Sequence, residues 1–389
     1  MPPSLSALFS RHSYKWLAFG SFAAYSFYYL AHVRRPVHVR TPRGEFGQRV
    51  LSHWESVRAR YWPFFFAWGA HFQIVLYVIL ANISRRLRLR RDLVRLSDGG
   101  TVSVDWDEDS KTPLPDDVPI VLILHGITGG SDDYAHTLRS IRARGWRGVA
   151  MNRRGHADTP LTTPKMNILG DADDLKQCID YIHSRYPRAV LLCIGFSAGG
   201  CALTRYLGET GANSRLIAAS AVSPAYDVRQ CLKRVHPWYC RLITFRLKSV
   251  FTRLLSSEPA LEAMLHAETL FDLVCSHVPI TGHETLEHFL ERMNPFLNFQ
   301  AVQTATLMLN AKDDPVAVYE NLVEAKAYAD TLPYNPNIFV VSTDVGSHCA
   351  WFEHDGFRPS SWCDRVVLDF FEAVMKSVDP ATATRTITL

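Results

Sequence analysis

The spacing of apolar residues changes along this chain. Two apolar runs without Asp, Glu, Lys or Arg, 16–33 and 61–83, lie near the N-terminus. The first has about the minimum length of a membrane span, and Arg34 and Arg35 follow it directly, which predicts a single membrane anchor over 16–33. A buried or interfacial helix is the alternative. Polar residues interrupt the second run and would be costly in a bilayer, so one span is favoured over two.

After residue 93 the pattern becomes that of an alternating α/β domain. The stretch VRLSDGGTVSVDW predicts two short strands joined by a turn, and PIVLILHG is a continuous apolar run, typical of a strand buried on both faces. Strand-like runs then alternate with helices expected at about 132–144, 170–185, 198–208 and 361–376. This alternation predicts a mostly parallel sheet with helices on both faces.

One stretch interrupts this alternation. Residues 225–305 show helical apolar spacing without a strand pattern, which predicts an inserted helical cap. The expected organisation is an anchor and basic linker over 1–60, an α/β domain over 61–378 and a disordered tail over 379–389.

Composition and charge exclude several classes of protein. With 47% hydrophobic and 21% charged residues the chain is not disordered, and a net charge of +4 is too small to indicate nucleic-acid binding. The basic excess lies in the first hundred residues, where it would suit anionic lipid headgroups or a solvated linker. The charges flanking 16–33 favour a cytosolic main domain. An endoplasmic-reticulum or lipid-droplet membrane is expected, with the orientation left open.

The eight cysteines are scattered and lack the spacing of a zinc site. They are expected to be mostly reduced, although a disulfide between Cys231 and Cys240 stays open. No metal and no cofactor is expected.

The strongest chemical motif is Gly195-Phe196-Ser197-Ala198-Gly199, which lies between a predicted strand and a predicted helix. In a nucleophile elbow the serine occupies a sharp, strained strand-to-helix turn, and its neighbours two positions away must be very small. The two glycines meet this requirement. Ser197 is therefore the candidate nucleophile.

A nucleophilic serine needs a base and an orienting acid, which follow it in the order Ser, Asp, His in hydrolases with such an elbow. His348 follows a late predicted strand and is the candidate base. Asp313 and Asp314 follow an earlier one; counting three residues from Asn310 favours Asp313, with Asp314 the alternative. Asp344, on the same loop as His348, is a third choice.

An oxyanion formed during acyl transfer needs two backbone N–H donors. Ala198, directly after the nucleophile, is expected to supply one. The second is expected from Ile127, because Gly126, Gly129 and Gly130 permit a tight turn in the loop after an early strand.

With these residues assigned, the sequence resembles the type-4 family of α/β-hydrolase-fold lipases. That family includes the mammalian α/β-hydrolase domain-containing proteins one, two and three and the yeast medium-chain ethyl-ester synthases. The matching stretches cover most of residues 60–355 in order: Trp68-Gly69-Ala70-His71-Phe72-Gln73, DGGTVSVDW, LHGITGGSDDY, NRRGHADTPLTTP, SRYP, GFSAGG and LNAKDDPV, with His348 after the last strand. The family's triad maps onto Ser197, Asp313 and His348.

The resemblance implies an α/β-hydrolase fold and a membrane-associated serine hydrolase that cleaves esters of lipid-like substrates: phospholipids, glycerides or medium-chain esters. An acyltransferase using the same acyl-enzyme and a catalytically silent membrane scaffold are the alternatives. The cap lacks the paired tyrosines and serine expected from the family, so acyl-chain and head-group preference stay open, as does the oligomeric state.

Overall fold

The computed structural model describes residues 11–83, 87–108, 112–255, 260–324 and 335–378. Within them nine strands form one sheet in the order β1-β9-β8-β7-β6-β4-β5-β3-β2. The strands are β1 (His38–Arg40), β2 (Arg90–Arg95), β3 (Thr101–Trp106), β4 (Ile120–Leu124), β5 (Arg147–Asn152), β6 (Leu191–Phe196), β7 (Leu216–Val222), β8 (Ala305–Ala311) and β9 (Ile338–Thr343). Neighbours from β5 to β9 pair in parallel, whereas β1, β2 and β3 pair antiparallel. The expected mostly parallel sheet is confirmed.

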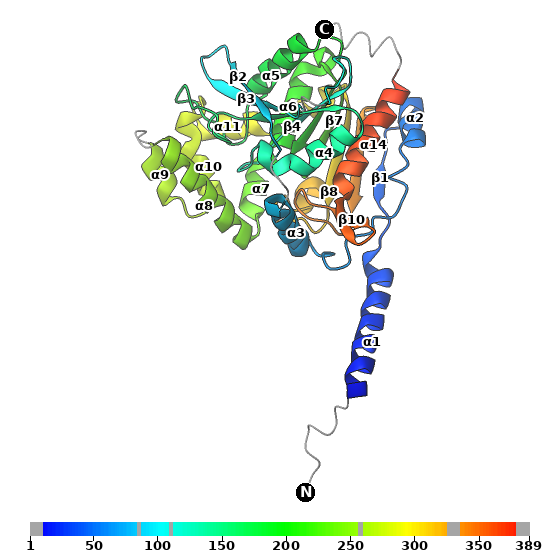
Figure 1. The fold of residues 1–389 in the computed structure, drawn as a ribbon. Helices are drawn as coiled ribbons and strands as arrows, with labels where there is room; N and C mark the ends of the chain where they lie inside the picture. The colour runs from blue at the N-terminus through cyan, green and yellow to red at the C-terminus, as the bar shows by residue number, and fades with distance from the viewer. Residues whose placement is uncertain (1–10, 84–86, 109–111, 256–259, 325–334, 379–389) are drawn as a thin grey trace.

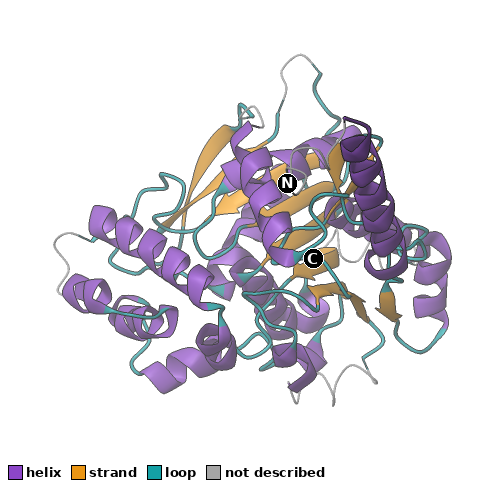
Figure 2. Ribbon diagram, turned by 90° about the horizontal axis from the view of Figure 1, so that it is seen from below, coloured by secondary structure: helices purple, strands orange, loops and turns teal. Residues whose placement is uncertain are grey.

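Helices enclose this sheet (Figures 1 and 2). Those outside the cap are α1 (Arg11–Tyr28), α2 (Glu45–His53), α3 (Ala70–Ile83), α4 (Ala135–Ala143), α5 (Ala172–Arg185), α6 (Ala198–Thr210), α12 (Glu320–Glu324) and α14 (Trp362–Ser377). A separate hairpin joins β10 (Phe352–Asp355) to β11 (Arg358–Ser361). The helices predicted from the alternating pattern are present, with ends shifted by a few residues.

The two faces of the sheet bury different side chains because successive residues of a strand point to opposite faces. On β4, Val121 and Ile123 pack in one core with residues of α2, α4 and α14. Ile120 and Leu122 pack in a second core with residues of α5 and α6. The continuous apolar run of β4 is therefore explained by burial on both faces.

The cap follows β7 and ends before β8, as the sequence pattern predicted. It consists of α7 (Val228–Arg234), α8 (Pro237–Leu254), α9 (Ala260–His266), α10 (Leu270–His277) and α11 (Leu286–Met293), with short 3₁₀ turns. These helices, together with Met166 and Ile168 of the segment before α5, bury a third apolar core around Leu247, Phe251 and Phe289. The cap is thus a helical layer beside the sheet (Figure 1).

Part of the segment expected to be a linker belongs to the folded unit. β1 pairs with β9 at the edge of the sheet, and α2 packs on α14. The buried indole of Trp54 donates a hydrogen bond to the carbonyl oxygen of Val366 over 3.0 Å. The compact domain therefore begins N-terminal to residue 61.

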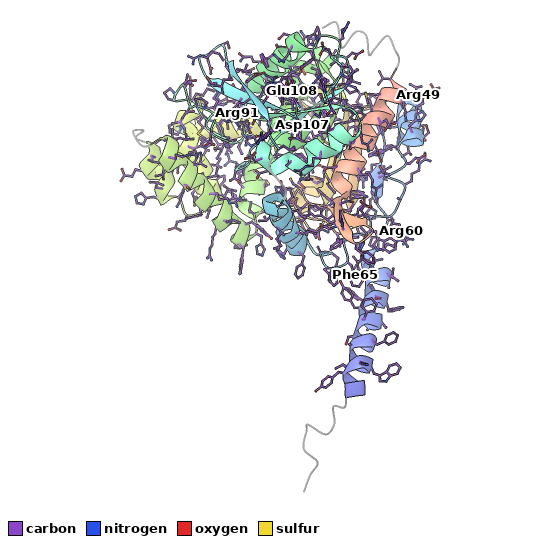
Figure 3. The ribbon with its side chains drawn as sticks, viewed as in Figure 1. Arg49, Arg60, Phe65, Arg91, Asp107 and Glu108 are labelled. Carbon is purple, nitrogen blue, oxygen red and sulfur yellow. The ribbon has the colours of Figure 1, made fainter. Side chains whose placement is uncertain are left out.

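The anchor predicted over 16–33 forms α1 and a short π-helical turn, Tyr29–Val33. Tyr25 and Tyr29 donate hydrogen bonds to the carbonyl oxygens of Phe65 and Pro63, so the end of α1 is attached to the body beside Phe65 (Figure 3). Among the described residues, no helix is both long enough and apolar enough to cross a bilayer. The predicted transmembrane span is therefore not found. The tail over 379–389 lies outside the described residues.

The second apolar run supplies α3, which packs against the domain. Gln73 is fully buried and donates hydrogen bonds to Ala67 O and Tyr61 Oη, while its Oε1 accepts the Phe352 N–H over 2.7 Å. The polar residue that argued against a second span thus ties α3 to the segment after His348.

Candidate active site

Ser197 lies in the turn between β6 and α6 with φ 52° and ψ −117°. Non-glycine residues rarely adopt this backbone, and the strain persists only where the surroundings impose it. The Ser197 N–H donates to Val222 O over 2.8 Å. A Cβ on Gly195 would lie 2.5 Å from the carbonyl oxygen of Gly199, so the elbow requires glycine there. This is the local geometry that the motif predicted.

The structure brings His348 against Ser197, although 151 residues separate them in the chain. His348 Nε2 lies 2.9 Å from Ser197 Oγ, and its Nδ1 lies 2.9 Å from Asp314 Oδ2. Asp314 is buried, and its Oδ1 accepts the backbone N–H groups of Val316 and Ala317 at 2.8 Å each. These bonds fix the carboxylate, which in turn orients the imidazole.

The preference for Asp313 as the residue holding His348 is therefore corrected to Asp314. The reason lies in where the strand ends: β8 continues through Ala311, and the Asp314 N–H bonds to Ala311 O over 3.4 Å. Counting three residues from Ala311 rather than Asn310 reaches Asp314. The third choice, Asp344, instead accepts from Lys312 over 2.6 Å at the surface.

Asp313 has a different environment. Burial, together with the neighbouring Asp314 carboxylate, raises its pKa to about 7, and the backbone N–H groups of Gly346 and Ala70 offset this only partly. Its Oδ1 has no hydrogen-bond partner among the described residues. Two adjacent carboxyl groups thus differ in role: Asp314 contacts the histidine, and Asp313 faces the start of α3.

The charge of Asp314 acts on His348. Burial opposes a charged imidazole, but the attraction of the Asp314 carboxylate outweighs it and raises the pKa of His348 well above its ordinary value. A proton taken from Ser197 would therefore be held strongly. The arrangement favours an imidazolium next to the nucleophile.

The glycine-rich loop after β4 lies beside Ser197: a Cβ on Gly126 would be 3.7 Å from Ser197 Cβ. Arg153 is buried and donates to the carbonyl oxygens of His125 over 2.8 Å and Gly126 over 2.6 Å. Cis peptide bonds are absent from the described residues, so the Ile127 N–H points away from the Gly126 carbonyl. Arg153 thereby sets the direction of the Ile127 N–H.

Further buried groups hold the same loop. His156 Nε2 lies 3.2 Å from Ile127 O, and Tyr134 Oη accepts the Gly126 N–H over 3.1 Å. Burial and the nearby Arg153 lower the pKa of His156 to about 3, so its ring is neutral. The sequence indicated no role for Arg153 or His156. Their signals were the polar string Arg153-Arg154-Gly155-His156 directly after a strand and its place in the matching stretch NRRGHADTPLTTP.

A cavity of about 440 Å³ opens above these groups. Its wall contains Ser197, His348, Ile127 and Ala198, together with apolar residues of α3 and the cap: Ile74, Tyr77, Val78, Leu232, Tyr239 and Ile243. Three sulfur atoms also line it, from Cys201, Cys231 and Cys349, and all eight cysteines are free. The hydrogen-bonded pair of Ser197 and His348 therefore lies in the wall of a mainly apolar pocket.

Comparison with known proteins agrees with this arrangement. The model of the family described as serine aminopeptidase, S33, matches residues 116–355. Phospholipase ABHD3 of Homo sapiens is 28% identical over 378 residues, covering 92% of this chain and 90% of the relative. The embryogenesis-associated protein EMB8 of Picea glauca is 28% identical, covering 77% of this chain and 70% of the relative.

A third relative is the medium-chain fatty acid ethyl ester synthase/esterase 2 of Saccharomyces cerevisiae. It is 23% identical over 381 residues, covering 76% of this chain and 82% of the relative. Because the family model matches more than half of the chain, this protein belongs to the serine aminopeptidase S33 family of α/β hydrolases and is a hydrolase of the esterase and lipase type.

Proposed function

We propose that this protein cleaves carboxylic esters of lipid-like molecules through an acyl-enzyme on Ser197. The observation that carries the proposal is the continuous line of hydrogen bonds from Asp314 through His348 to Ser197 at the base of an apolar cavity. A general base within hydrogen-bonding distance of a serine on a strained backbone is the arrangement that activates the serine hydroxyl as a nucleophile.

The reaction proceeds in two halves. Ser197 Oγ attacks the ester carbonyl carbon while its proton passes to His348 Nε2, and the Asp314 carboxylate stabilises the resulting imidazolium. His348 then gives that proton to the departing alcohol oxygen, leaving Ser197 acylated. Water repeats the sequence: it loses a proton to His348, attacks the acyl carbon and releases the carboxylic acid as Ser197 regains its proton.

The charge that develops on the carbonyl oxygen would be stabilised by the backbone N–H groups of Ile127 and Ala198. Two observations support this assignment: both residues line the cavity beside Ser197, and Arg153 holds the Gly126 carbonyl, which fixes the direction of the Ile127 N–H on the opposite side of the same trans peptide. Donors aimed in advance at a developing oxyanion need no rearrangement during the reaction.

The substrate is proposed to be an ester with a hydrocarbon acyl chain, such as a phospholipid. The apolar cavity wall supports this, because an acyl chain gains about 0.8 kcal/mol for each CH₂ removed from water. The name of the human relative, a phospholipase, points the same way. Such a substrate resides in a membrane or a lipid droplet, so the enzyme would work at a lipid surface.

A second candidate is acyl transfer from the same acyl-enzyme to an alcohol instead of water. The yeast relative, named as an ethyl ester synthase as well as an esterase, favours keeping it. Supplying ethanol or a lysolipid with an acyl donor separates the two activities. A transferase forms the new ester at the expense of free acid, whereas a hydrolase forms acid alone.

The primary experiment treats the purified full-length protein with a fluorophosphonate probe and locates the adduct by peptide mass spectrometry. The expected adduct is on Ser197. Ser197→Ala should lose labelling and ester turnover, whereas Ser184→Ala, which removes an exposed serine of α5, should keep both. Folded protein that fails to react would contradict the proposal and favour a catalytically silent scaffold.

A further inference from the structure

Two helices, α3 and α8, form part of the cavity wall. Ile74, Tyr77 and Val78 of α3 and Tyr239 and Ile243 of α8 contribute to the cavity wall. His71 Nδ1 of α3 lies 2.8 Å from Tyr239 Oη of α8, and their rings stack with centroids 5.7 Å apart. Both helices therefore have one side on the acyl pocket and meet at the same end.

The other sides of these helices present large apolar side chains to solvent. On α3, Phe72 and Val75 are 61% and 54% exposed; on α8, Trp238 and Phe245 are 79% and 71% exposed. With Ile79 and Leu242, which are also exposed, these six residues define what we call the apolar rim; of the six, Leu242 also lines the cavity. Large apolar side chains exposed on the helices that line a pocket mark contact sites.

The charges of these helices are one-sided. Neither α3 nor α8 contains an acidic residue, and α8 carries Arg241, Arg246, Lys248 and Arg253. Apolar side chains together with basic ones on a helix are the pattern of segments that lie in the headgroup region of a membrane. This charge complements lipid phosphate groups.

Hydrogen bonds also connect α3 to the segment that carries His348. Ser347 Oγ, next to His348, donates to Ala70 O at the start of α3 over 2.7 Å. Gln73 joins the same helix to Phe352. The α3 part of the rim is therefore joined by hydrogen bonds to the segment that carries His348.

We propose that the apolar rim is the surface by which this enzyme docks on a phospholipid layer, so that an acyl chain passes from the layer between α3 and α8 into the catalytic cavity. This inference rests on the proposed function. The helix α1 projects from the body on the same side as α3 (Figure 1), and its exposed aromatic side chains, including Trp16, Phe19 and Phe22, would meet the same layer.

The test compares a rim variant with a matched control in the full-length protein. Val75→Glu with Phe245→Glu places two acidic groups on the rim without changing a residue of the cavity wall. Leu93→Glu is the control, because Leu93 is an apolar residue of similar exposure, 57%, on β2 at the distant edge of the sheet. Vesicles of phosphatidylcholine with about 30% phosphatidylserine present the substrate, and p-nitrophenyl acetate reports turnover in solution.

The rim variant should hydrolyse vesicle phospholipid at least fivefold more slowly than wild type, and p-nitrophenyl acetate within twofold of it. The control should match wild type on both. Equal loss in both variants, or unchanged vesicle turnover in the rim variant, would overturn the proposal. If light scattering showed that the rim variant converts a dimer to a monomer while vesicle turnover is unchanged, the apolar rim would be a dimer interface and the proposal would fail.

A second measurement follows docking without catalysis. Brominated lipids should quench tryptophan fluorescence, and Trp238→Phe should remove part of that quenching; if it removes none, Trp238 does not enter the layer and the proposal fails. Quenching of Trp238 without any ester turnover or Ser197 labelling would instead leave docking intact and refute the proposed function.

Discussion

The catalytic centre and the apolar rim differ in the interactions that their side chains make. At the centre, His348 and Asp314 make directed hydrogen bonds of 2.9 Å and shorter in buried surroundings. In the apolar rim, the exposed side chains of α3 and α8 are hydrophobic and cannot make such hydrogen bonds. Ester turnover would therefore depend on the positions of single atoms. Docking by the apolar rim would depend on its total apolar area, so one hydrophobic residue of the rim could replace another.

A related contrast exists inside the centre, between two adjacent carboxyl groups. Asp314→Asn should lower kcat by about 10³–10⁴-fold, because the amide cannot stabilise the imidazolium and favours the wrong tautomer. Asp313→Asn should leave kcat within about threefold. Steady-state kinetics on a soluble ester measures both, and the reverse order of effects would restore the assignment made from the sequence alone.

The next largest effect concerns Arg153, a positioning residue that touches the loop and not the substrate. A lysine at position 153 cannot donate to the His125 and Gly126 carbonyl oxygens in the way that the arginine does. We therefore expect Arg153→Lys to lower kcat by about 10–100-fold with KM little changed, which is less than the loss expected when an oxyanion donor is removed. Binding of a trifluoromethyl ketone analogue should weaken in parallel.

Arg154→Lys is the matched control for Arg153. The Arg154 guanidinium pairs with Asp174 and Asp98, away from the glycine-rich loop. Its replacement should lower the melting temperature while leaving kcat nearly unchanged. Equal losses of kcat in both variants would mean that Arg153 acts only through stability.

The pH dependence sharpens the role of Asp314. His348 acts as a base only when neutral, and the raised pKa keeps it protonated to higher pH, so kcat/KM should fall about tenfold per pH unit below a midpoint above 6.5. Asp314→Asn should move this midpoint to lower pH. A profile that stays flat down to pH 5 would exclude a histidine base.

The smallest expected effect is on stability. Unfolded Asp313 loses its proton near pH 3.8, whereas the folded group keeps it to about 7, so stability should decline as the pH rises between these values. Asp313→Asn should flatten this decline and raise the melting temperature at pH 8 by about 1–3 °C, for a gain on the order of 1–2 kcal/mol. Calorimetry at pH 5 and pH 8 tests it, and an equal pH dependence in both proteins would refute it.

Short-range patterns determined much of this protein. The elbow around Ser197 could be predicted because its strain and its glycines are neighbours in the chain. The cap could be predicted because a long stretch of helical spacing interrupts the strands. His348 could be placed because strand order puts the loops that follow parallel strands at one edge of the sheet.

Tertiary structure decided what depends on contacts between distant segments. Choosing Asp314 over Asp313 required the true end of β8, and the roles of Arg153 and His156 required the packing of one loop on another. The apolar run 16–33 predicted a membrane span, but an apolar sequence does not distinguish a segment that contacts lipid from one that contacts protein. The same holds for 61–83, where the polar Gln73 is buried and hydrogen-bonded to Phe352. Hydrophobic patterning indicates which residues leave water, and only the fold shows which groups they contact.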